Sequence, residues 1–171
     1  LAVNKDSLER GLVKNPMIKS AQVYYSLDGY IHVNIQQREP VLRVLTGEGY
    51  YVDRDGRVMP LSSKFTSRVV VATGDINKKF ACEKLGPFAM KLKNEPFWDA
   101  YIEQLVVRSN EDVVMIPKVG DFRIVLGKVD DCEARLEKLM LFLKDGITKK
   151  GWNRYKEINL KFDNQVVCVR K

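Results

Sequence analysis

The chain has 171 residues, of which 45% are hydrophobic and 30% are charged, a composition typical of a soluble globular protein with one medium domain or two small ones. Its longest apolar runs, such as Val69 to Ala72, are far shorter than the roughly 18 to 20 residues that a membrane-spanning helix needs. The net charge of +7 is compatible with a nucleic-acid or anionic-lipid partner. The basic residues alternate with acidic ones, however, as in Glu133 to Lys138. We therefore interpret the charged residues as solvated surface and expect no nucleic-acid partner.

The first predicted element is a short amphipathic helix. Asp6 or Ser7 is expected to cap it, because a short polar side chain can accept a hydrogen bond from the free N–H groups of the first turn. Leu8 and Leu12 supply its apolar face, and Pro16 ends it. The chain starts without a basic and apolar leader and without a small-residue cleavage site, so we expect that it is cut from a longer protein.

A β-hairpin follows, with strands over residues 22–27 and 30–36. Both segments alternate between apolar and polar residues, and Asp28-Gly29 between them readily takes the positive φ angles of a tight turn. The apolar residues of the second strand share one face: Ile31, Val33 and Ile35.

Pro40 marks a change in the character of the chain. Proline donates no hydrogen bond to a strand ladder, so it ends regular pairing or confines it to an edge. We place a domain boundary here, with one domain over residues 1–40 and another over residues 41–171. The second domain opens with a hairpin within residues 41–52, and Asp55-Gly56 then turns the chain into a third strand.

The middle of the second domain combines strands with a helix. Residues 69–72 form a short, fully apolar strand, and residues 77–93 have a helical pattern that Gly86-Pro87 interrupts. Three further strand-like runs follow, separated by turn residues: 101–108, 113–117 and 122–126. Successive strands joined by short turns favour antiparallel pairing, so we predict an antiparallel sheet.

The clearest predicted helix covers residues 133–144. Its apolar side chains recur at the spacing of one helical face, opposite charged ones: Leu136, Leu139, Met140 and Leu143. This helix is expected to lie across the sheet. The predicted fold class is therefore α+β, an αβ unit followed by an antiparallel β-domain with helices packed on one face.

The last predicted strand is expected to lie at the edge of the sheet. Residues 158–162 alternate in polarity, Asp163-Asn164 turns the chain, and residues 165–169 return with apolar side chains on both faces. An edge strand exposes unpaired N–H and C=O groups, to which a partner strand can add. Most terminal strands are simply parts of a sheet, and the residues alone leave both interpretations open.

No catalytic constellation is visible in the sequence. The only histidine, His32, lies on the polar face of its strand, where we interpret it as solvated rather than as a ligand or general base. There is no GxSxG turn and no phosphate-binding glycine loop. The carboxylate pairs Asp53/Asp55 and Asp130-Asp131 are interpreted as turn and helix-cap residues. We therefore predict that the protein is not an enzyme and needs no cofactor.

The three cysteines do not indicate a metal site. Cys82, Cys132 and Cys168 are widely spaced and form no CxxC pair, so neither zinc nor a disulfide framework is predicted. We interpret them as small buried apolar side chains.

Several segments follow one recognisable order of motifs. Residues 15–41 contain Asn-Pro after a helix, then a hairpin, then Arg-Glu-Pro, and residues 50–61 place an Asp and a Gly before a hairpin. Residues 115–127 contain Pro-x-x-Gly and close in Leu-Gly, and residues 155–167 contain the alternating final strand. In this order the segments resemble the extracytoplasmic part of the FtsQ/DivIB family of bacterial cell-division proteins.

The match to this family is incomplete in places. Asn159 stands where the family usually has Asp, Lys161 stands where it usually has Arg, and residues 66–94 match little. The resemblance implies a partial POTRA domain over residues 1–40, without its first strand, and an FtsQ-type β-domain over residues 41–171.

The resemblance also implies a role and a location. Members of this family are single-pass proteins of the bacterial inner membrane, with the domains seen here in the periplasm and an N-terminal membrane helix ahead of them. They act as non-enzymatic scaffolds of the divisome that bind FtsB and FtsL and help to recruit and regulate septal peptidoglycan synthesis. A POTRA-type chaperone or assembly module of outer-membrane protein biogenesis or secretion is the alternative, although such proteins are expected to carry repeated POTRA units or a barrel.

Two sets of contact residues follow from the resemblance. A segment of FtsB would add as a strand at the end of the β-domain, on these residues: Phe162, Asn164, Val166, Val167, Cys168, Val169 and Arg170. The POTRA hairpin would make recruitment contacts with other division proteins, on these residues: Tyr24, Tyr25, Tyr30, Arg38 and Glu39.

Overall fold

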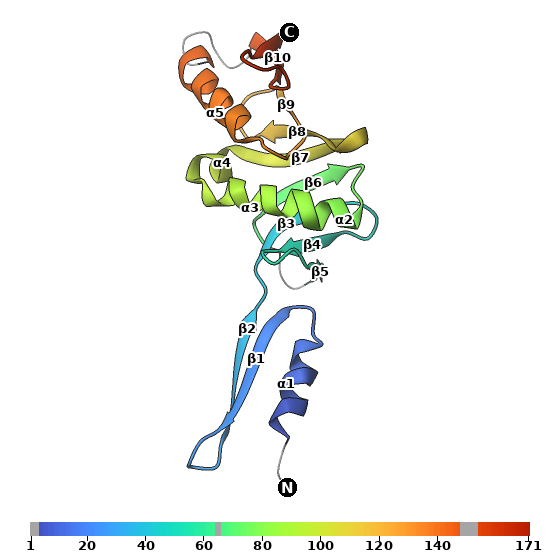
Figure 1. Ribbon diagram of the computed structural model, residues 1–171, viewed down its shortest axis with the longest axis vertical. Coiled ribbons are helices and arrows are strands. Elements are labelled where there is room, and N and C mark those ends of the chain that lie inside the picture. Colours follow the sequence, from blue (N-terminus) through green and yellow to red (C-terminus); the bar gives the residue numbers. More distant parts are fainter. Residues whose placement is uncertain (1–3, 64–65, 148–153) are drawn as a thin grey trace.

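The computed structural model describes residues 4–63, 66–147 and 154–171 (Figure 1). The molecule is elongated, with a helix and a two-stranded hairpin at one end and a nine-stranded sheet with its helices at the other (Figure 1). The α+β fold class predicted from the sequence is confirmed.

Helix α1 (Lys5–Val13) begins two or three residues earlier than predicted. Its N-cap is Asn4, whose side-chain oxygen accepts a hydrogen bond from the N–H of Ser7 at 3.1 Å. The prediction of Asp6 or Ser7 as cap was wrong, because both already lie within the first turn. The helix packs along the hairpin, and the carboxylate of Glu9 accepts a hydrogen bond from the N–H of Val23 at 2.7 Å.

The hairpin is formed by β1 (Ile18–Tyr25) and β2 (Ile31–Gln37), paired antiparallel. Gly29 has a φ of 86°, as the predicted tight turn requires. In β1, Ala21 and Val23 are buried. The opposing residues of β2 share their face as predicted but stay exposed, because α1 contacts β1 rather than β2: Ile31, Val33 and Ile35.

The large sheet has the strand order β11-β10-β9-β8-β7-β6-β3-β4-β5. Its strands are β3 (Pro40–Val44), β4 (Tyr50–Asp53), β5 (Val58–Pro60), β6 (Val70–Gly74), β7 (Ile102–Arg108), β8 (Asp112–Pro117), β9 (Arg123–Gly127), β10 (Tyr155–Asn159) and β11 (Val167–Arg170). Most neighbours are antiparallel, but β3–β6, β6–β7 and β9–β10 are parallel. For these three pairs the antiparallel prediction was wrong. Helical crossovers join β6 to β7 and β9 to β10, and such connections produce parallel pairs.

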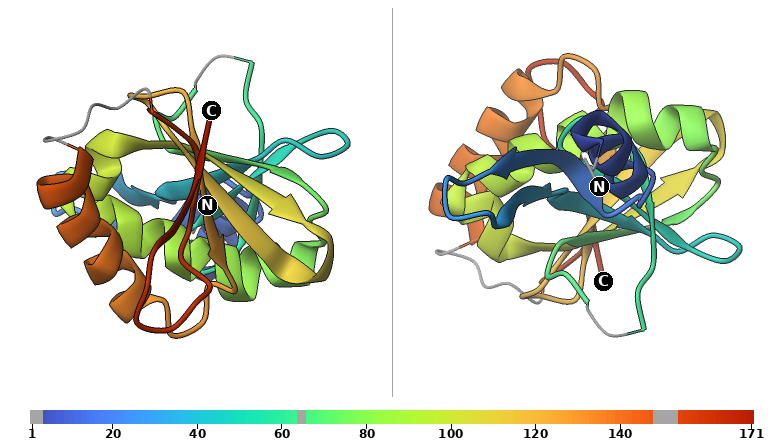
Figure 2. Two further views of the ribbon diagram at one scale, coloured as in Figure 1. Left: turned by 90° about the horizontal axis from the view of Figure 1, so that it is seen from above. Right: turned by 90° about the horizontal axis from the view of Figure 1, so that it is seen from below.

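The helices of the large sheet lie on one of its faces (Figure 2). They are α2 (Lys78–Phe80), a π-helical turn (Ala81–Leu85), α3 (Gly86–Asn94), α4 (Pro96–Tyr101), α5 (Glu133–Leu141) and a second π-helical turn (Phe142–Ile147). Crossovers between parallel strands are right-handed. Because β6 to β7 and β9 to β10 step in the same direction across the sheet, the two crossovers place their helices on the same face.

Two features of the helices differ from the sequence prediction. Gly86-Pro87 does not interrupt the first helix, which continues from Lys78 to Asn94 through the π-helical turn. Proline lacks an N–H and crowds the carbonyl of residue i−4, and a widened turn directly before it relieves both constraints. Asp130-Asp131 does not cap α5 through a side chain, since its N-cap is Cys132. Instead Asp130 forms an ion pair with Lys84.

A buried ion pair joins the hairpin to the large sheet. Arg38 lies 2.7 Å from the carboxylate of Asp53, and their side chains are only 11% and 2% exposed. Asp53 also accepts hydrogen bonds from the N–H groups of Asp55 at 2.9 Å and Arg57 at 2.8 Å, which confirms its predicted role as a turn residue. On the surface nearby, Lys19 of β1 pairs with Asp55 at 2.9 Å. The predicted domain boundary at Pro40 falls beside this junction.

Candidate functional site

Strand β11 is one of the two edge strands of the large sheet, and β5 is the other. In the strand order β11 has β10 on one side and no strand on the other among the residues that the structure describes. It pairs antiparallel with β10, with Cys168 opposite Ile158. The predicted terminal edge strand is confirmed, although it begins at Val167 rather than at Gln165.

Alternate backbone groups of β11 point toward the free edge. Leu160, directly after β10, donates its N–H to a carbonyl oxygen of β9 at 2.9 Å. Successive residues of a strand direct their backbone groups to opposite sides. The N–H and C=O groups of Asn159 therefore point toward β11, where Asn159 lies opposite Val167. Cys168 and Arg170 therefore direct their N–H and C=O groups away from β10, where an added strand would bind.

The side chains of β11 divide between the two faces of the sheet. Val166 and Cys168 are half-buried and pack against the core beneath the helices. Burial raises the pKa of the Cys168 thiol. Val167 and Val169 alternate with them on the opposite face, and Val169 is largely exposed.

The turn before β11 is held by helix α5. Lys138 of α5 donates hydrogen bonds from Nζ to the carbonyl oxygens of Phe162 at 2.6 Å and Leu160 at 3.4 Å. Asn164 takes a φ of 59°, which a short polar residue tolerates in a turn, and the ring of Phe162 is exposed. Together with β11, the structure brings all seven residues of the predicted strand-addition site to one edge of the sheet.

Sequence reasoning missed a residue that extends this edge across the sheet. Asn159 of β10 lies beside Val167 on one side and beside Val125 of β9 on the other. All three point to the face opposite the helices, on which Val125 is buried and Asn159 is half-buried, so only Asn159 extends the accessible edge. The parallel register of β9 and β10 places them there, and neither segment alone carries a signal for that register.

The second predicted set of contact residues does not form one surface. Tyr24, Tyr25 and Tyr30 lie at the tip of the hairpin, at one end of the molecule. Arg38 and Glu39 lie at the opposite end of the hairpin, where Arg38 pairs with Asp53 and Glu39 pairs with Arg54. The tyrosines remain an exposed surface, whereas Arg38 is part of the junction.

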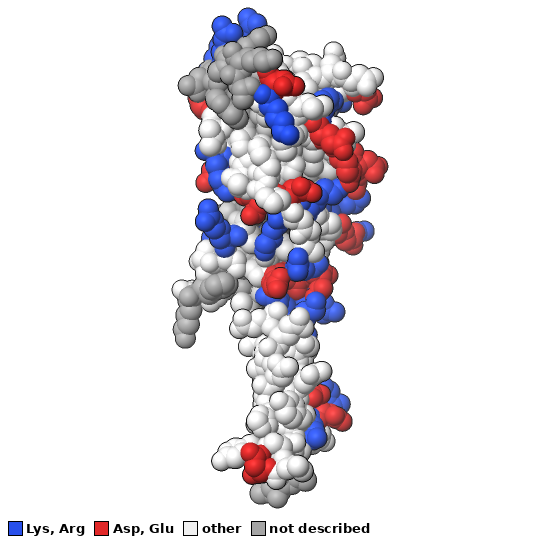
Figure 3. Space-filling view, turned by 90° about the vertical axis from the view of Figure 1, so that its left-hand side faces the viewer, with Lys and Arg blue, Asp and Glu red and all other residues white. Residues whose placement is uncertain are grey.

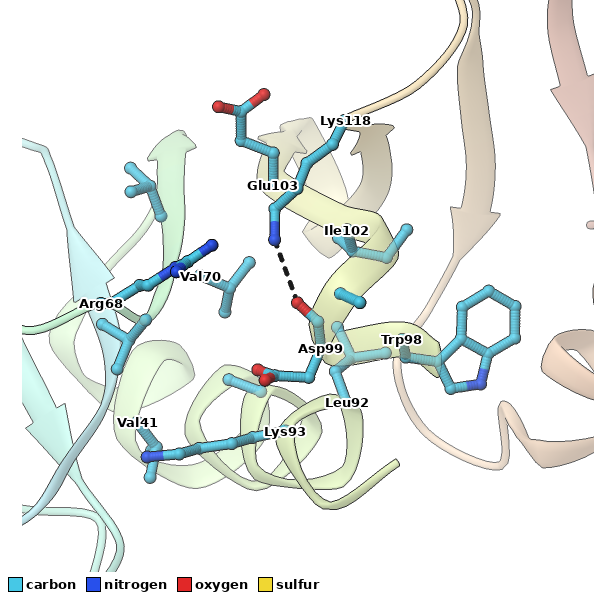
Figure 4. Close-up of a pocket in the computed structure, with 14 residues that line it drawn as sticks. Val41, Arg68, Val70, Leu92, Lys93, Trp98, Asp99, Ile102, Glu103 and Lys118 are labelled. Atoms are coloured by element: carbon cyan, nitrogen blue, oxygen red, sulfur yellow. Dashed lines mark hydrogen bonds between the residues drawn. The ribbon is translucent and has the colours of Figure 1, made fainter. Parts of the chain in front are cut away.

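A pocket lies where the N-terminal parts of β6 and β7 meet α3 and α4 (Figure 4). Its volume is about 700 Å³, and charged side chains surround apolar walls. Lys118 donates a hydrogen bond from Nζ to the carbonyl oxygen of Asp99 at 3.1 Å. No Ser, Cys or His lines this pocket within the described ranges.

Among the residues that the structure describes, no three His, Cys, Asp or Glu side chains lie close enough to hold a metal ion. In the same part of the chain, no helix is long and apolar enough to cross a membrane. The three cysteines are free, with Cys132 buried and Cys82 and Cys168 half-buried.

Comparison with known protein families matches the part of the chain that forms the large sheet. Residues 39–169, which contain eight of its strands and most of β11, match the family model described as FtsQ/DivIB, C-terminal related. No curated protein matches the chain closely enough to count as a relative. The match covers well over half of the chain, and the chain therefore belongs to the FtsQ/DivIB family of cell-division proteins.

Proposed function

We propose that this chain is a non-enzymatic divisome scaffold that binds FtsB by strand addition to β11, together with FtsL, and helps to recruit and regulate septal peptidoglycan synthesis. The observation that carries the proposal is the free edge of β11, where Cys168 and Arg170 direct backbone groups outward. The family match supports the role in division. The proposed setting is the periplasm, with an N-terminal helix in the inner membrane.

Strand addition at β11 would give affinity and specificity through different groups. Main-chain hydrogen bonds from the added strand would satisfy the outward N–H and C=O groups and supply affinity. Side chains that alternate between the two faces would supply specificity, through contacts with Val167 and Val169 on the uncovered face and with Phe162 at the turn.

The hairpin would supply recruitment contacts in this proposal. Of the five residues predicted for that role, only the three tyrosines are exposed near one another, at the tip. Arg38 and Glu39 would contribute indirectly, because their ion pairs hold the hairpin against the large sheet.

The sharpest test replaces Cys168 with proline. Cys168→Pro removes one outward N–H without removing an N–H that faces β10, and proline is tolerated on edge strands when its nitrogen faces outward. The matched control, Cys168→Ala, removes the same side chain and keeps the N–H. We expect Cys168→Pro to weaken binding of the FtsB periplasmic segment at least about tenfold by calorimetry, as for the loss of a buried hydrogen-bond partner, and Cys168→Ala to bind nearly as the parent chain does.

Thermal unfolding of each variant checks that the fold persists. If Cys168→Pro does not fold, the same comparison of FtsB affinity is made between Arg170→Pro and its control Arg170→Ala, at the more exposed end of the strand. Equal FtsB affinity in a folded proline variant and its alanine control would contradict strand addition at β11.

A further inference from the structure

The tip of the hairpin carries a group of exposed apolar and aromatic side chains. We call it the tip cluster and define it as Tyr24, Tyr25, Leu27 and Tyr30. Leu27 is fully exposed, and Tyr30 is 68% exposed. Exposed apolar side chains scattered singly are ordinary on a protein surface, but a contiguous patch marks a binding surface. The four side chains of the tip cluster are exposed together around one turn, which makes the tip of the hairpin a candidate binding surface.

The tip cluster has an ordered layout. Tyr24 and Tyr25 are neighbours in β1, so their rings lie on opposite faces of the hairpin. The Tyr24 ring stacks on His32 with centroids 5.0 Å apart, and the ammonium group of Lys5 lies 4.8 Å from the centroid of the Tyr25 ring. Tyrosine rings thus flank both faces of the hairpin, with Leu27 in the turn between the strands.

This layout fits the interface of a lipid bilayer. Tyrosine has an apolar ring and a polar hydroxyl, and it is enriched where hydrocarbon meets head groups. A leucine in the turn can enter the apolar layer, while a nearby lysine keeps its charge among the head groups. The tip cluster projects at the end of a thin hairpin, where it can reach the plane of a bilayer (Figure 1).

Part of the turn is satisfied by hydrogen bonds within the turn itself. Ser26 donates its N–H to the carbonyl oxygen of Tyr30 at 3.0 Å, and Gly29 donates its N–H to the carbonyl oxygen of Ser26 at 3.1 Å. The hydroxyl of Ser26 donates to the carboxylate of Asp28, the one acidic residue in the turn. Because backbone groups without partners are costly to bring into an apolar medium, these internal bonds suit the turn for entering the interface.

The position of the tip cluster agrees with a membrane contact. It lies at the end of the molecule remote from the large sheet, beside the first residues of α1 (Figure 1). On the face shown in Figure 3, charged side chains of both signs are dense over the large sheet and sparser over the hairpin end. The membrane helix proposed above would precede α1 and so join the molecule at this same end.

We propose that the tip cluster is a peripheral membrane-contact site, which inserts Leu27 into the interface of a phospholipid bilayer with the tyrosines at head-group depth. This contact does not depend on strand addition at β11, but it takes the place of the recruitment contacts proposed above for the three tyrosines. The β11 edge lies at the other end of the molecule (Figure 1). Failure of one proposal therefore leaves the other intact.

The test is co-sedimentation of the 171-residue chain with vesicles of phosphatidylethanolamine and phosphatidylglycerol. We expect the chain to partition onto the vesicles and Leu27→Ser to lower the partition coefficient about tenfold, as for the loss of one buried leucine side chain. Leu27→Trp should bind at least as well as the parent chain, because tryptophan favours the interface. The matched control is Leu141→Ser, which removes a leucine that is also exposed but lies in α5, and its binding should equal that of the parent chain.

Binding measured at high salt distinguishes insertion of Leu27 from electrostatic attraction between the positively charged chain and the anionic lipid. Attraction between exposed charges is screened there, whereas apolar insertion persists. Binding that vanishes in high salt for the parent chain, or that is equal for Leu27→Ser and Leu141→Ser, would overturn the proposal. Absence of any vesicle binding would also overturn it and would leave the tip cluster as a surface for protein recruitment.

Discussion

Gly74 and Gly11 show how differently the same residue type can be constrained. Gly74, at the end of β6, has a φ of 105°, and a Cβ built there would lie 2.0 Å from the carbonyl oxygen of Val107. Gly11, inside α1, has no atom within 4 Å of a built Cβ. The first position requires glycine for conformation and for space, whereas the second is a weak point in a helix.

These surroundings predict opposite effects of one substitution. Gly74→Ala should lower the free energy of unfolding by about 2 kcal/mol or more, because strained backbone and a steric clash add together. Gly11→Ala should raise the stability of α1 by roughly 0.5 to 1 kcal/mol, since alanine restricts the unfolded chain and favours helix. Urea unfolding of both variants measures the difference, and a Gly74→Ala protein as stable as the parent would contradict the close approach to Val107.

At the scale of elements, α5 has one apolar face that is buried against the sheet and one face that is exposed. Leu139 is completely buried against the sheet, whereas Leu141, two residues further on, is 63% exposed. Periodicity placed Leu139 on the apolar face because residues at i, i+3, i+4 and i+7 of a helix share one side. The contact of α5 with the sheet also positions Lys138, which holds the turn before β11.

The two leucines of α5 should respond differently to truncation. Leu139→Ala is expected to cost about 2 to 5 kcal/mol of stability, through lost burial and the cavity left behind. Leu141→Ala should change the stability by less than about 0.5 kcal/mol, as surface substitutions usually do. Thermal unfolding by calorimetry compares the two, and similar losses would show that α5 does not pack as described.

At the scale of the whole molecule, one junction links the hairpin to the large sheet. Its centre is Asp53, which combines the ion pair with Arg38 and two backbone hydrogen bonds of its own turn. Loss of the partner of a buried carboxylate costs far more stability than loss of the partner of an exposed one. Arg38 therefore contributes more to the stability of this junction than the exposed ion pair of Lys19 and Asp55 does.

Removal of the buried cation should loosen the junction locally. In Arg38→Ala we expect faster amide hydrogen exchange in β1 and β2 and in the turn after Asp53, with unchanged protection in β7 to β9. Lys171→Ala breaks an exposed ion pair with Asp121 at the far end of the sheet and serves as the control. Exchange measured by mass spectrometry distinguishes the two, and a uniform rise across both sheets would refute a local role for Arg38.

Much of the fold was predictable from local signals. The tight turns at Asp28-Gly29 and Asp55-Gly56 were recognised because glycine accepts positive φ angles at no steric cost. The apolar face of α5 was recognised from its helical spacing. Local signals failed at α4, whose six residues are too few to show a helical period, and at Gly86-Pro87, where a π-helical turn accommodates the proline.

The sequence by itself determined the identity and order of most strands, the position of the last helix and the resemblance to a division-protein family. Only the tertiary structure decided which strands are neighbours, because parallel pairs such as β6–β7 and β9–β10 join segments that are distant along the chain. It also separated Arg38 and Glu39 from the tip tyrosines. Alternation within a strand depends on adjacent residues and can be read locally, whereas register and exposure depend on which distant segment packs alongside.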